Sequence, residues 1–223
     1  MKLKKIASLM LAGVMAVSML AGCNNAPDNG NGGAVPPADN GTSTGLSAEV
    51  LELADISARK DIKAADNAKL NSAVNEMVKT SASAYENDIA KANALTKLAY
   101  TTADLKAMHG VAQKIMAGAE YAQTVTDNWA AITADGTNES ATLYDFYYVR
   151  KGLGENVINN LLADELDRIA TEIGAPDPGD GDTYEYTVSI AKADWQVGKD
   201  ADATKDGVVI GIAVTLDYTK AEF

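Results

Sequence analysis

The stretches "TYEYTVSI" (183–190) and "VVIGIAVTLDY" (208–218) decide the fold class. In each of them a large apolar side chain stands at every second position. Such a period of two is typical of a β-strand with one buried face. The polar segment "GKDADATKDG" (198–207) joins the two stretches, so we expect an antiparallel hairpin. An isolated hairpin is only marginally stable, and its apolar face should therefore pack against other elements.

Helical patterns precede this hairpin. Ser47 is predicted to cap a first short helix, and apolar residues three and four positions apart predict a second helix over 70–95. Thr101 and Asp104 form a capping-box-like start for a third helix, whose apolar face covers 105–132. These apolar faces are expected to build the core.

A tyrosine-rich stretch at 142–150 has two interpretations. As a strand it would place Tyr144, Phe146 and Tyr148 on one face, but it is also compatible with the start of the helix predicted for "ENVINNLLADELDRIATEI" (155–173). We leave this choice open. The order of elements predicts an α+β fold, in which an N-terminal helical layer packs on a small C-terminal antiparallel hairpin or sheet.

The beginning of the chain has the pattern of an export signal. Three lysines at positions 2, 4 and 5 precede a run without charge over 6–19, followed by "LAGC" (20–23). A run of about 14 apolar residues is too short to span a bilayer and is typical of a secretory signal peptide.

The "LAGC" segment resembles the lipobox of bacterial lipoproteins. The resemblance covers residues 1–23 and implies cleavage between Gly22 and Cys23, with a diacylglyceryl group on the Cys23 thiol and an acylated new amino terminus. Cys23 is the only cysteine of the chain. We therefore expect a signal peptide at 1–22 and a protein held on the outer face of a bacterial cell membrane by its lipid.

The segment after Cys23 is predicted to be a tether. Residues 24–45 are rich in Asn, Gly and Pro and hold Val35 as the only large apolar side chain. Such a segment cannot bury enough apolar surface to offset the entropy of ordering. The predicted organisation is a lipidated, disordered 23–45 segment followed by one folded domain over 46–223.

The charge of the chain narrows the choice of partners. Removal of 1–22 leaves 16 basic and 31 acidic residues, a net charge of −15. Phosphate backbones repel such a surface, so the composition excludes a nucleic-acid role. The expected contact with the membrane is the lipid on Cys23.

One acidic segment is similar to a metal site. Asp200, Asp202 and Asp206 resemble the carboxylates of a calcium loop, but Thr204 stands where a further carboxylate belongs, and no glutamate closes the loop. We expect no cofactor and a solvated turn here, with Ca²⁺ as the alternative.

No motif in 46–223 selects a chemistry. The single histidine, His109, lies at the edge of an apolar stripe and is expected to pack there, and carboxylate pairs such as Asp164 and Asp167 occur in any acidic helix. We therefore expect a non-enzymatic module that binds a surface protein, a wall polymer or a small ligand. The alternatives are a carboxylate-based extracellular hydrolase and, because 57–77 is loosely similar to type IV pilin-like proteins, a pilin-like assembly subunit.

Overall fold

A computed structural model describes residues 45–80, 85–99, 102–118, 121–123, 129, 132, 140–174, 183–197, 205–219 and 221. All of them belong to one compact unit, Pro37–Phe223. The predicted signal peptide, Cys23 and the tether up to residue 44 lie outside the described residues.

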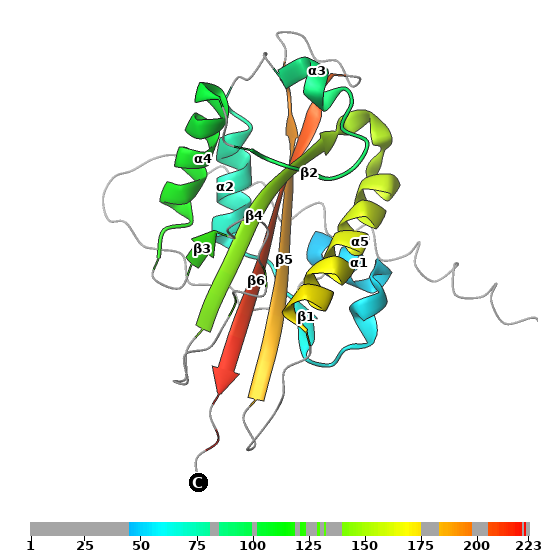
Figure 1. Ribbon diagram of the computed structural model, residues 1–223, viewed down its shortest axis with the longest axis vertical. Coiled ribbons are helices and arrows are strands. Elements are labelled where there is room, and N and C mark those ends of the chain that lie inside the picture. The colour runs from blue at the N-terminus through cyan, green and yellow to red at the C-terminus, as the bar shows by residue number, and fades with distance from the viewer. Residues whose placement is uncertain are drawn as a thin grey trace, which may run out of the picture. The chain divides into compact units, whose positions relative to one another are not determined.

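The described residues form a six-stranded mixed sheet. Five of its strands have the order β1-β5-β6-β4-β2, and the sixth, β3, pairs with β4. Its strands are β1 (Ile62–Ala64), β2 (Thr96–Lys97), β3 (Tyr121–Gln123), β4 (Ser140–Arg150), β5 (Thr183–Trp195) and β6 (Gly207–Thr219). The three long strands β5, β6 and β4 are antiparallel neighbours and make up the centre (Figure 1). The short strands extend only parts of the outer edges.

The predicted hairpin is confirmed. Strands β5 and β6 pair from Thr183↔Thr219 to Trp195↔Gly207. The stretch left open at 142–150 is a strand, since β4 pairs with β6 along its whole length. The helix predicted after it is α5 (Glu155–Ile173).

Helices cover both faces of the sheet (Figure 1). Helices α1 (Leu46–Leu53) and α5 pack on one face, and α2 (Ala68–Met77) and α4 (Ala103–Ile115) pack on the other. The short helix α3 (Glu86–Ile89) and two 3₁₀ helices, η4 (Asp55–Ala58) and η7 (Lys151–Leu153), complete the described elements. Helices and a mixed sheet confirm the α+β class, but the sheet is larger than a hairpin and is covered from two sides.

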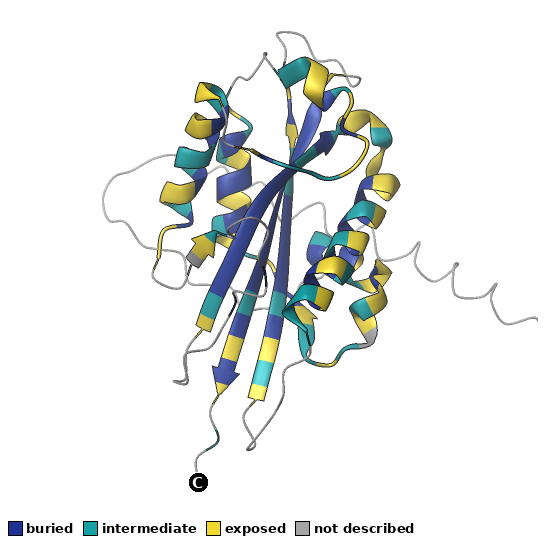
Figure 2. Ribbon diagram, viewed as in Figure 1, coloured by how far each residue is buried: buried dark blue, intermediate teal, exposed yellow. Residues whose placement is uncertain are grey.

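Small residues explain why helices also cover the second face of the sheet, which the alternation of large apolar residues does not predict. Between the large apolar residues of β5 and β6 stand small ones, among them Ala191, Gly211 and Ala213, and these let α2 approach the sheet closely. A Cβ atom on Gly211 would lie 2.8 Å from Leu70 Cδ1 and 2.9 Å from Val74 Cγ2. The long strands are consequently buried over most of their length, while the outward faces of the helices are exposed (Figure 2).

Two predicted helices are shorter than expected. The helix predicted over 70–95 ends as α2 at Met77, and α3 and β2 follow it. The helix predicted over 105–132 ends as α4 at Ile115, and its cap is Thr102, whose Oγ1 accepts from Leu105 N at 3.4 Å, rather than Thr101. Periodic apolar spacing continued past both ends because Ile89 and Trp129 are buried without belonging to α2 or α4.

Ser47 is not the cap of α1. The helix begins at Leu46 with Gly45 as its N-cap, and the Ser47 side chain is fully buried against β5. Its Oγ accepts a hydrogen bond from Ile190 N at 2.9 Å and donates one to Ile190 O at 3.4 Å. The hydroxyl thus takes the place of a strand neighbour just beyond the end of β1.

Candidate functional site

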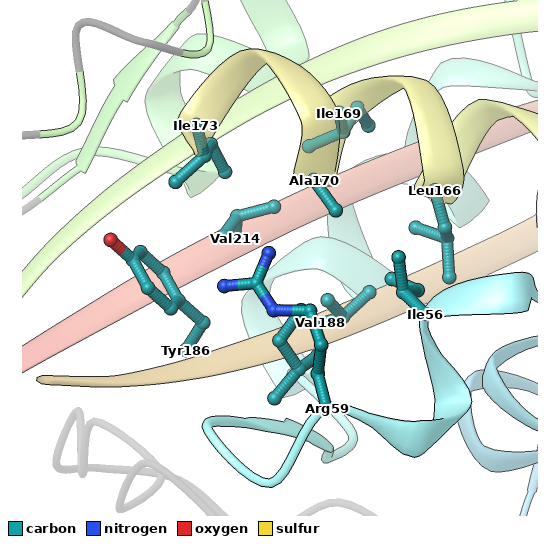
Figure 3. Close-up of a pocket in the computed structure, with 10 residues that line it drawn as sticks. Ile56, Arg59, Leu166, Ile169, Ala170, Ile173, Tyr186, Val188 and Val214 are labelled. Atoms are coloured by element: carbon teal, nitrogen blue, oxygen red, sulfur yellow. The ribbon is translucent and has the colours of Figure 1, made fainter. Parts of the chain in front are cut away.

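A small pocket lies between the C-terminal half of α5 and the sheet (Figure 3). Its lining is apolar except for Arg59 and the hydroxyl of Tyr186, and it comprises Ile56, Arg59, Ile62, Leu166, Ile169, Ala170, Ile173, Tyr186, Val188 and Val214. The loop between η4 and β1 supplies Arg59, and η4, α5 and the strands β1, β5 and β6 supply the other lining residues.

Arg59 closes one side of this pocket. Its guanidinium group points toward the end of α5 (Figure 3), where Nη2 donates to Gly174 O at 3.3 Å, and its Nε donates to Asp61 Oδ1 at 3.1 Å. The hydrogen bond from Arg59 lowers the pKa of the Asp61 carboxyl below its usual value, and burial raises the pKa of Tyr186. The guanidinium is therefore already paired with protein groups.

The volume of the pocket limits what it can hold. Its cavity volume is about 10 Å³, which is room for about one water molecule. Pockets for metabolites usually measure about 300–1,000 Å³. In this conformation the pocket is a packing defect beneath α5.

A buried polar cluster lies at the opposite edge of the sheet, on β4. Asp145 is completely buried. It lies on β4 just after the residues that pair with β3, which end at Tyr144, and before those that pair with β2, which begin at Tyr147. Its Oδ1 accepts from Phe146 N at 2.8 Å and from Gln123 Nε2 at 3.2 Å, and its Oδ2 pairs with the ammonium group of Lys97. Asp145 thereby accepts a hydrogen bond from the Phe146 amide, which faces outward in the gap between the two edge strands.

The charge of Asp145 affects neighbouring groups. Burial raises the pKa of Tyr144, and the charge of Asp145 adds to this rise. Burial lowers the pKa of His109 on α4, and Asp145 opposes this effect. The expectation that His109 packs at the margin of the core agrees with its half-buried side chain. Because both Asp145 oxygens bind protein donors, the arrangement fits a structural role better than proton transfer to a substrate.

Of the predicted calcium ligands, only Asp206 lies within the described residues, while Asp200 and Asp202 lie outside them. Asp206 is 6% exposed, and its Oδ1 accepts from Val197 N at 3.3 Å. The carboxylate thus joins the two ends of the β5–β6 connection. Across the described ranges we find no group of three or more Asp, Glu, His or Cys side chains that could hold a metal ion.

The carboxylates of α5 also bind protein groups. Asp167 accepts from the amides of Asp55 and Ile56 at 3.0 Å each, and so caps η4 across more than one hundred residues of sequence. Glu172 accepts from Trp129 N at 2.8 Å. In the sequence Asp167 and Asp164 form an unselective pair, and no local signal could reveal that the partners of Asp167 lie in η4.

Comparisons with protein-family models, with curated proteins and with solved structures found no match to this chain. Within the part of the chain that the structure describes, we also find no helix that is long and apolar enough to cross a membrane.

Proposed function

We propose that this protein is a lipid-anchored extracytoplasmic module that binds a partner and performs no catalysis. The observation that carries the proposal is the "LAGC" segment (20–23), which resembles a lipobox and contains Cys23, the only cysteine of the chain. Two acyl chains at this residue would give stable anchoring at the bacterial membrane, whereas a single chain binds only marginally.

The described polar groups support binding over catalysis. The carboxylates that stand out by burial or by contacts, Asp145, Asp167 and Asp206, each accept hydrogen bonds from backbone amides. Groups engaged in this way hold loops and edges together. A carboxylate-based hydrolase would instead need two carboxyl groups facing a cleft that admits substrate.

The partner is of macromolecular size in this proposal. The pocket beneath α5 has room for about one water molecule, so a small ligand would have to bind elsewhere, and we favour a surface protein or wall polymer. The net charge of −15 after removal of 1–22 makes nucleic acid a poor partner.

The anchor is tested by replacing one atom. In cells that express the wild-type protein, we expect it in the detergent phase of a Triton X-114 extraction, with an amino-terminal peptide that starts at acylated Cys23. Cys23→Ser should abolish acylation and shift the protein out of that phase. Unmodified Cys23 in a chain that still begins at Met1, found in the soluble fraction, would contradict the proposal.

Binding and hydrolysis are separated with isolated cell wall of the producing bacterium. If the partner is a wall polymer, the protein should co-sediment with the wall and leave the amount of soluble wall fragments unchanged. If the partner is a surface protein, co-sedimentation should require that the wall retain its proteins. Release of soluble fragments above a heat-denatured control would mean that the protein is a hydrolase.

A further inference from the structure

Within the part of the chain that the structure describes, the outer edge of β5 is open beyond Ile190. On this edge the even-numbered residues turn their backbone N–H and C=O groups outward. Tyr186 N donates to Asp61 O at 2.7 Å, and Val188 O accepts from Ala65 N at 3.0 Å. Ile190 N donates to the Ser47 hydroxyl. The same alternation turns the backbone groups of Lys192 and Asp194 outward. Within the described residues, the structure gives these backbone groups no hydrogen-bond partner.

The charges on this open edge are arranged symmetrically about Ala193. Lys192 and Asp194 flank it and point to the same face of the sheet, because they are two residues apart. An antiparallel strand with the same sequence, related by a two-fold axis at Ala193, would place Lys192 opposite Asp194 of its partner and Asp194 opposite Lys192. The edge is therefore complementary to itself in both charge and hydrogen bonding.

We propose that Lys192–Asp194 is a self-association site, at which a second copy of this chain adds its β5 edge in antiparallel fashion. Each Lys192 then exchanges two backbone hydrogen bonds with the partner's Asp194, which gives four across the axis. The two sheets become one continuous sheet. The proposal does not depend on the lipid anchor.

Existing ion pairs do not block this arrangement. Lys192 Nζ lies 2.6 Å from Glu155 Oε1, and Lys151 Nζ lies 2.6 Å from Asp194 Oδ2. The Glu155 and Asp194 side chains are 70% and 66% exposed, and exposed pairs are weak and easily exchanged. Because the shared strand is short, the dimer is weak and depends on concentration. Confinement on a membrane would raise the effective concentration.

Charge exchange tests the site, measured by sedimentation equilibrium on the full chain carrying Cys23→Ser. Lys192→Asp places aspartates opposite each other twice, and Asp194→Lys does the same with lysines, so each should weaken dimerisation about tenfold. The double variant Lys192→Asp with Asp194→Lys restores opposite charges and should regain the wild-type dissociation constant to within about threefold.

The double variant separates this proposal from a purely intramolecular role. Within one chain, Lys192→Asp puts a second carboxylate beside Glu155, and Asp194→Lys puts a second ammonium group beside Lys151. Both intramolecular ion pairs of the edge therefore become repulsive, and recovery of dimerisation can come only from pairing between chains. Failure of the double variant to recover, while its melting curve stays cooperative, would overturn the proposal.

Disulfide formation tests the register. Residue 193 would lie opposite itself as a non-hydrogen-bonded pair, with Cα atoms about 4.5 Å apart, which suits a disulfide. In the Cys23→Ser background, Ala193→Cys should cross-link about tenfold faster than the more exposed Asp194→Cys, whose two copies lie diagonally. Equal rates, or a protein that is monomeric at all concentrations because its own chain or another partner covers the edge, would contradict self-association.

Discussion

Along its β4 edge the sheet is closed from Thr142 to Arg150, whereas along its β5 edge the described residues close it only as far as Ile190. The β4 edge is covered by β3, by the Asp145 carboxylate, by β2 and finally by Ala92 O, which accepts from Arg150 N at 3.0 Å. The β5 edge is covered by β1 and then by the Ser47 hydroxyl. In both places a side chain continues the bonding where a short strand ends.

The two edges differ in the backbone that lies beyond this side chain. At β4 the Asp145 carboxylate lies between β3 and β2, so this buried charge joins the two edge strands. At β5 nothing in the described chain takes over from Ser47, and the edge ends in the charged residues Lys192 and Asp194. Charged side chains on an exposed edge limit unspecific strand addition, and the same charges allow a partner of matching sequence.

Substitutions on the faces of the sheet should be the most damaging, because both faces are buried beneath helices. Ala213 is 1% exposed on the face that α2 covers. Ala213→Asp should abolish cooperative folding, because it buries a charge without a partner. Thr219→Asp, at an exposed site of the same strand parity, should change little. Similar urea denaturation curves for both variants would mean that α2 does not cover β6.

The next effect compares the same deletion on the two edges. Asp145→Ala leaves the outward Phe146 amide without its acceptor and deprives Lys97 of its carboxylate, so it should lower the free energy of unfolding by about 3 kcal/mol. Asp194→Ala removes a carboxylate that is 66% exposed and should cost at most about 1 kcal/mol. Urea denaturation measures both; equal losses would erase the proposed difference between the edges.

A smaller loss is expected at Ser47. Ser47→Ala leaves the Ile190 amide and carbonyl groups buried without a partner, at a cost of about 2 kcal/mol in unfolding free energy. The exposed Ser57 in η4 provides the matched control, for which Ser57→Ala should stay within about 0.5 kcal/mol. A neutral Ser47→Ala in thermal and urea unfolding would show that the hydroxyl does not serve as a strand neighbour.

The smallest effect is the pH dependence of stability that comes from His109 on α4. Burial lowers the pKa of His109 in the folded state, so the unfolded chain binds more protons near pH 6.5. The stabilisation is present above about pH 6.5 and is lost as the pH falls through the folded pKa. His109 is the only histidine, and His109→Gln should make the melting temperature less dependent on pH over this range. If the melting temperature of the variant changes with pH as steeply as that of the wild type, another group is responsible.

Much of the fold could be predicted from the sequence where local pattern and final structure agree. The alternation in 183–190 and 208–218 identified β5 and β6, and the helical pattern of 155–173 matched α5. Strand β4 stayed ambiguous because Asp145 interrupts a run that is compatible with either a strand or a helix. Its burial becomes understandable only once β2 and β3 are seen to leave a gap.

The remaining features depend on contacts between distant residues. Ser47 has the composition of a helix cap, yet its partner is Ile190, 143 positions away. Small residues such as Gly211 weaken the apolar signal of one sheet face, although they are what lets α2 approach it. The short edge strands β1, β2 and β3 carry too few residues for any periodicity, so the edges on which the comparison depends could not be anticipated.

Amide hydrogen exchange, resolved by residue in dilute, monomeric protein, shows whether β4 is closed along its edge and β5 is open beyond Ile190. The amides of Phe146 and Ile190 should be strongly protected, because each donates to a buried side chain. The amides of Lys192 and Asp194 should exchange nearly as fast as in an unfolded chain. Protection of Lys192 and Asp194 equal to that of Ile190, or free exchange at Phe146, would contradict the account.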